Sequence, residues 1–69
     1  MQNVNYNLLK MLHNTLDDIW RLEKYYVRDA KKAKCHSQAA LKEMLKNEKK
    51  HAEALKREIV LRVKAGKFN

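Results

Sequence analysis

The chain has 69 residues, which is enough for one small domain at most and too short for a multidomain protein. It contains no proline, a single glycine and 35% charged residues, the composition of long helices. No apolar run approaches the roughly 20 residues that span a membrane, so we expect no membrane partner. The formal net charge of +8 favours affinity for polyanions.

Residues 4–33 are predicted to form the first helix, with Asn3 or Asn5 capping its start. Apolar residues recur at steps of three and four, which is typical of a helix packed in a bundle. One acid, Glu23, stands inside this otherwise apolar stripe. The stripe consists of Leu9, Leu12, Leu16, Ile19, Glu23, Tyr26 and Ala30.

Residues 34–37 are predicted to form a turn, with Ser37 capping a second helix over residues 38–65 that Gly66 ends. A single continuous helix is the main alternative, because the turn contains neither glycine nor proline. The second apolar stripe also contains an acid, Glu48, with His51 beside it. This stripe consists of Leu41, Met44 or Leu45, Glu48, His51 or Ala52, Leu55, Ile59, and Arg62 or Val63.

Glu48 and His51 are three residues apart, so a helix places them on one face, a spacing that helical metal sites use. The midpoint between Glu23 and Glu48 falls at the predicted turn. An antiparallel hairpin is therefore expected to bring the two acids to one level, with His51 one turn further along.

Two aromatic residues lie near this predicted level. Trp20 is expected to face His51, and Tyr26 follows Glu23 by about one turn. We expect both to be core residues. A role beside a metal site is the alternative for both.

A two-helix hairpin cannot bury both sides of such broad apolar stripes, so we expect an all-α fold in which two antiparallel hairpins form a four-helix bundle. Its core would hold two copies each of Glu23, Glu48 and His51, the ligand inventory of di-iron and di-manganese carboxylate bundles. Two divalent ions would neutralise the four carboxylates. Iron or manganese suits these ligands, and zinc can also bind them.

On Glu23, on Glu48-Lys49-Lys50-His51 and on the stripes around them, the chain resembles the ferritin-like superfamily, which includes ferritins and rubrerythrins. It is most similar to the encapsulated ferritins in size and in that one chain supplies two helices, half of the bundle. The resemblance covers about residues 8–59. It implies two iron ions per dimer, bound by Glu23, Glu48 and His51, and oxidation of Fe(II) or reduction of oxygen or peroxide. The enzyme class would be a ferroxidase or a peroxidase-type oxidoreductase. The chain is shorter and more basic than these relatives, which does not suit iron storage.

The alternative function is a non-enzymatic interaction module. Here a basic helical hairpin would dimerise and bind nucleic acid or an acidic partner through its lysines. The single cysteine, Cys35, excludes an intramolecular disulfide, and no secretory signal is visible at the start of the sequence. We therefore expect a cytoplasmic protein in either case.

Overall fold

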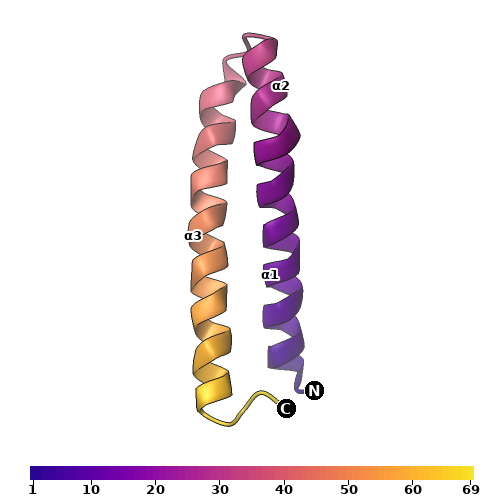
Figure 1. The fold of residues 1–69 in the computed structure, drawn as a ribbon, viewed down its shortest axis with the longest axis vertical. Coiled ribbons are helices and arrows are strands. Elements are labelled where there is room, and N and C mark those ends of the chain that lie inside the picture. The colour runs from indigo at the N-terminus through magenta and orange to yellow at the C-terminus, as the bar shows by residue number, and fades with distance from the viewer.

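The computed structural model describes residues 1–69 as two antiparallel helical arms (Figure 1). The first arm consists of α1 (Asn3–Arg21), a π-helical turn η1 (Leu22–Tyr26) and α2 (Val27–Lys32), and the second arm is α3 (Ser37–Lys64). The two chain ends lie at the same end of a rod measuring 49 × 16 × 14 Å. The all-helical hairpin is as predicted, and the chain does not continue as one straight helix.

The turn between the arms is formed by the backbone of Lys34, which adopts a positive φ of 54°. The Cys35 amide donates to the Ala30 carbonyl at 2.9 Å, and the Lys34 amide donates to the Lys31 carbonyl at 3.1 Å. These two bonds form a Schellman motif, which satisfies the last carbonyls of the helix without glycine. Gly66, with φ +70°, ends α3 with the same pair of bonds and confirms the predicted helix end.

Both predicted helix caps are wrong. The residue before α3 is His36, and no side chain caps this helix. The Ser37 hydroxyl donates instead to the Cys35 sulfur at 3.0 Å. The residue before α1 is Gln2, and no side chain caps this helix either. Asn3 is already its first residue, and Asn5 lies inside it with a fully buried side chain.

At the open end of the hairpin, a polar cluster joins the start of α1 to the end of α3. Arg62 donates to Asn5 Oδ1 at 2.6 Å and to Gln2 Oε1 at 2.7 Å. The Asn5 amide group donates to the Lys67 carbonyl at 3.0 Å, and the Gln2 backbone amide donates to the Asn69 carbonyl at 2.9 Å. The tail after α3 is therefore tied back to the first helix.

The stripe that α1 buries against α3 differs from the predicted one. Leu9 and Leu16 are exposed, whereas Thr15 and Leu22 are buried. The apolar surface of α1 is wider than one neighbouring helix can cover, so α3 covers only one side of it. Beyond residue 22, the extra residue of the π-helical turn shifts the buried positions by one. The buried or half-buried positions of the first arm are Asn5, Leu8, Leu12, Thr15, Ile19, Leu22, Val27 and Ala30.

Candidate metal centre

Glu48 and His51 lie side by side on α3, as their spacing predicts. His51 Nδ1 is 3.3 Å from Glu48 Oε1, within hydrogen-bonding distance. The Glu48 side chain is 26% exposed and borders the contact with α1, whereas the His51 side chain is 60% exposed. A carboxylate and an imidazole are thus paired at the edge of the hairpin, where a further ligand can reach them.

Glu23, from the π-helical turn, contacts a lysine in the hairpin. Lys49 Nζ lies 3.1 Å from Glu23 Oε1, and both side chains are more than half exposed. No group of three or more His, Cys, Asp or Glu side chains within the single chain could hold a metal ion. The single hairpin therefore brings together Glu48 and His51 but leaves Glu23 outside their pair.

Trp20 is not a core residue in the hairpin. Its side chain is half exposed, and its ring packs edge-on against Tyr25, with centroids 5.4 Å apart and an interplanar angle of 83°. Tyr26 is also half exposed, but it lines a hollow together with Glu48. The two aromatic residues therefore differ, because only Tyr26 borders the candidate ligand pair.

The hollow beside Glu48 has a volume of about 330 Å³ and lies between the two arms. Asp18 lines it from α1, so a second carboxylate shares this surface with Glu48. The sequence pattern placed Asp18 outside the predicted stripe, and no sequence signal marks it, because the hollow forms only when the two arms pack. The lining residues are Asp18, Leu22, Tyr26, Leu41, Met44 and Glu48.

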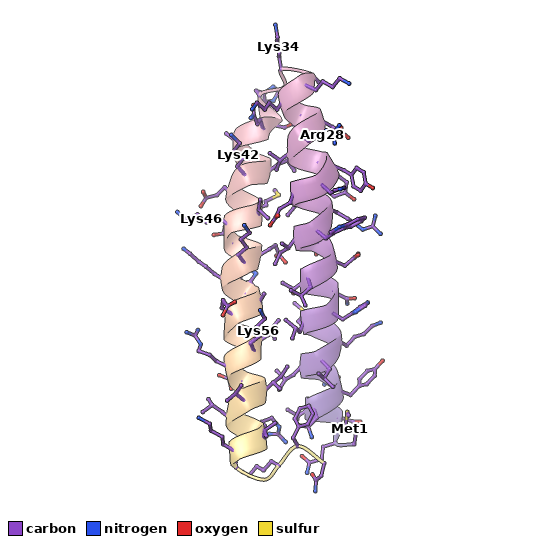
Figure 2. The ribbon with its side chains drawn as sticks, viewed as in Figure 1. Met1, Arg28, Lys34, Lys42, Lys46 and Lys56 are labelled. Atoms are coloured by element: carbon purple, nitrogen blue, oxygen red, sulfur yellow. The ribbon has the colours of Figure 1, made fainter.

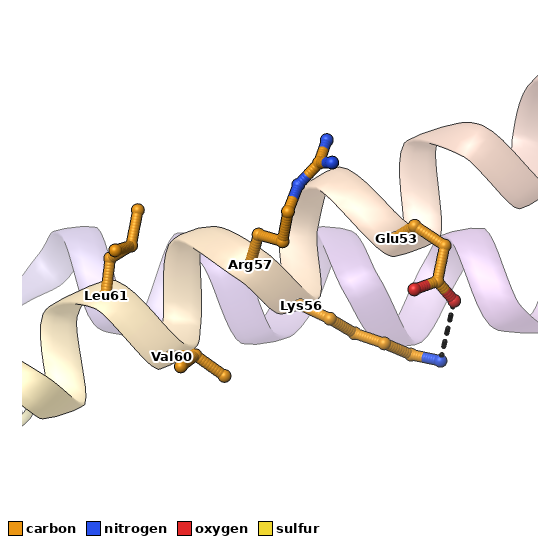
Figure 3. A pocket seen from close by; sticks show the side chains of 5 residues that line it. All are labelled: Glu53, Lys56, Arg57, Val60 and Leu61. Atoms are coloured by element: carbon orange, nitrogen blue, oxygen red, sulfur yellow. Dashed lines mark hydrogen bonds and ion pairs between the residues drawn. The ribbon is translucent and has the colours of Figure 1, made fainter.

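A second hollow, of about 270 Å³, lies on the surface of α3 (Figure 3). Val60 and Leu61 form its apolar part, and Lys56 pairs with Glu53 at 3.4 Å beside them. None of the predicted metal ligands lines this hollow, so it does not belong to the candidate centre.

Basic side chains cover much of the remaining surface. Lys34 extends from the turn, and Lys46 points away from the first arm (Figure 2).

None of the helices combines the length and apolar character needed to cross a bilayer. Comparisons of the chain with protein-family models, with curated proteins and with solved structures find no match.

Proposed function

We propose that two copies of this chain form a ferritin-like four-helix bundle that binds a pair of iron ions and acts in Fe(II) oxidation or in reduction of oxygen or peroxide. The observation that carries the proposal is the contact between His51 and Glu48. It places an imidazole and a carboxylate together beside the contact between the two arms. In a carboxylate–histidine metal centre, one helix contributes such a pair of ligands.

The surface of the hairpin supports a dimer. Its accessible area is 5456 Å², whereas a compact protein of 8.2 kDa exposes about 4500 Å². The excess, about 900 Å², is close to the roughly 800 Å² that each partner buries in a standard protein interface. Only five of the 69 residues are buried, and large apolar side chains remain exposed along both arms. A second copy would cover this apolar area.

The hydrogen bond between the two α3 residues suits metal binding. When the His51 Nδ1–H donates to Glu48 Oε1, the imidazole is held as the tautomer whose Nε2 lone pair is free. Manganese and zinc accept the same ligand types, but zinc, unlike iron, has no redox chemistry.

One further carboxylate from the first arm of each chain would make a two-ion centre neutral. Two Glu48 side chains and two such carboxylates carry four negative charges, which two divalent ions neutralise. Without cations, burial of these groups at an interface would cost several kcal/mol each or force them to take up protons. The sequence pattern names Glu23 for this role. Its exposed pair with Lys49 contributes only about 0–1 kcal/mol, so the pair does not hold Glu23 strongly.

The proposal is tested by metal uptake and turnover. The purified protein, dialysed against Fe(II) without oxygen, is expected to retain about one iron per chain and to oxidise added Fe(II) when oxygen is admitted. Glu48→Gln and His51→Ala should lose both properties. Glu43→Gln and His13→Ala, which change exposed residues of the same types, should keep both. Absence of iron from the native protein, or iron that survives both site substitutions, would contradict the proposal.

A basic interaction module is the second candidate, and one observation favours it. Lys42, Lys49 and Lys56 are seven residues apart and so form one stripe along α3. If this stripe binds nucleic acid, the logarithm of the affinity falls linearly with the logarithm of the salt concentration, with a slope of roughly −0.9 per phosphate contact. A binding titration with duplex DNA at three salt concentrations distinguishes this function from metal uptake.

A further inference from the structure

We propose that one edge of the hairpin is a docking surface for an acidic amphipathic helix of a partner protein. This inference goes beyond the proposed function, because it needs no metal ion. We name this surface the basic edge, and it is defined by one stripe on each arm, with residues seven positions apart. The stripes consist of Leu9, Leu16 and Glu23 on the first arm and of Lys42, Lys49 and Lys56 on α3.

A contact between the arms places these two stripes on the same side of the hairpin. Lys49 Nζ lies 3.1 Å from Glu23 Oε1. Because the arms are antiparallel, Leu16 lies two turns before Glu23 and is level with Lys56, which lies two turns after Lys49. Lys49 follows Met44 by five residues, which turns it about 140° around α3. The basic edge therefore lies on the far side of the hairpin from the hollow that Met44 lines.

The α1 side of the basic edge is apolar and accessible. Leu9, Leu16 and Trp20 are 38% to 51% exposed. Trp20 belongs to this side because it follows Leu16 by four residues. Leu9 borders a hollow of about 430 Å³, which is lined by Met1, Tyr6, Leu9, Lys10 and His13. A row of exposed apolar side chains beside a hollow suits the apolar face of a partner helix.

The α3 side of the basic edge is positively charged. Lys42 makes no ion pair, and Lys49 and Lys56 pair with Glu23 and Glu53 at exposed positions. Such exposed pairs contribute little to stability, so a carboxylate of a partner can replace them. The net charge of +8 adds a long-range attraction for acidic molecules.

An acidic amphipathic helix matches both sides of the basic edge, because its apolar residues would cover α1 and its carboxylates would pair with the lysines of α3. The groove between two packed helices also suits a third helix. Duplex nucleic acid would match the lysines but would leave Leu9 and Leu16 uncovered. A second copy packed here about a two-fold axis would bring two lysine stripes into one interface, where they repel each other.

The experiment measures binding of a synthetic peptide to the intact protein through the fluorescence of Trp20, the only tryptophan. The peptide spans about three heptads, with leucine at the two core positions and glutamate at the two flanking positions of each. One control peptide has lysine in place of glutamate, and the other has serine in place of leucine. We expect only the first peptide to shift the Trp20 emission to shorter wavelength, because binding removes water from the indole ring.

Lys42→Glu and Leu9→Ser test the two sides of the basic edge separately. Each is expected to weaken binding of the glutamate peptide by more than about tenfold, through charge repulsion or lost apolar contact. Lys50→Glu is the charge control, because Lys50 points about 100° away from Lys49. Met11→Ser is the apolar control, because exposed Met11 lies roughly 160° around α1 from Leu9. Both controls should bind within about threefold of wild type.

Helix content and solution mass are recorded for every variant, so that loss of binding is not confused with loss of fold. Equal binding of the glutamate and lysine peptides, or full binding by Lys42→Glu, overturns the proposal. Binding of duplex DNA or of phosphatidylglycerol vesicles, without binding of the glutamate peptide, also overturns it. So does dissociation of a dimer by Leu9→Ser, because the basic edge would then hold a second copy. None of these results depends on iron, so the proposed function stands or falls separately.

Discussion

Arg62 Nε donates a hydrogen bond of 2.6 Å to Oδ1 of Asn5, whose side chain is fully buried between the two arms. The same Asn5 donates to two carbonyls of the tail, so one side chain satisfies three groups. The contact joins residues 57 positions apart and fixes how far α3 is displaced along α1. A polar residue buried between two helices is a well-attested way of fixing how one helix is positioned along the other.

Asn5→Ala should therefore lower the free energy of unfolding by about 2 kcal/mol, because the Arg62 guanidinium and two tail carbonyls lose a buried partner. Urea unfolding at a fixed protein concentration measures the change. Asn7→Ala, an exposed asparagine of the same helix, serves as the control and should change stability by less than about 0.5 kcal/mol. Equal effects of the two substitutions would show that the polar cluster contributes nothing.

The left-handed backbone of Lys34 leads to a stabilising substitution. Its φ of 54° is costly for a residue with a Cβ atom, so Lys34→Gly should raise the free energy of unfolding by up to about 1 kcal/mol. Gly66 has φ +70°, and Gly66→Ala should lower stability by about the same amount. Thermal unfolding of both variants provides the comparison. A lower melting temperature for Lys34→Gly would contradict this account of the turn.

Cys35 is expected to react with alkylating agents at lower pH than an ordinary thiol. The Ser37 hydroxyl donates to its sulfur at 3.0 Å, and this hydrogen bond, aided by the Ser37 backbone amide, lowers the pKa of Cys35. The folded pKa lies below the unfolded one. The associated stabilisation is therefore present above the unfolded pKa and is lost as the pH falls through the folded pKa.

The rate of iodoacetamide alkylation as a function of pH measures this pKa. Ser37→Ala should move the midpoint of the profile to higher pH, towards the value of a free cysteine. An unchanged midpoint in Ser37→Ala would mean that the hydroxyl does not act on the thiol.

The edge of the hairpin that contains the hollow beside Glu48 can be tested as a dimer surface without any metal. Met44→Glu introduces a charge into the hollow, and burial of that charge in a dimer should weaken association by about a hundredfold or more. Leu16→Glu is the matched control, because Leu16 is exposed and lies two residues from Asp18, roughly 160° around α1. Sedimentation equilibrium should show dissociation for Met44→Glu only. Dissociation by Leu16→Glu alone would place the interface on the opposite edge.

The helices and the turn could be predicted from the sequence because their signals are local. The three-and-four spacing of apolar residues, the lysines before the turn and Gly66 place the helix ends to within a few residues. The choice of buried stripe could not be predicted in the same way. Leu9 and Leu16 belong to a regular apolar pattern, whereas the buried positions include polar Asn5 and Thr15. Only the position of α3 decides between the two stripes.

The contact between Glu48 and His51 could be predicted because the two residues are close in sequence, and helical geometry alone brings them together. Which residues of the first arm lie beside this pair depends on how the arms align. The π-helical turn, which lacks a sequence signal here, contains Glu23 and alters the facing of the residues after Leu22. That Asp18 lines one hollow with Glu48 could not be predicted, because Asp18 lies outside the regular stripe and only the packed hairpin forms the hollow.

Native mass spectrometry of the protein after anaerobic exposure to Fe(II) tests the central claim most directly, because it reports copy number and bound metal in one spectrum. The account predicts a dimer of the 8.2 kDa chain that contains two iron ions, and a metal-free species for Glu48→Gln. A wild-type monomer without iron would contradict it.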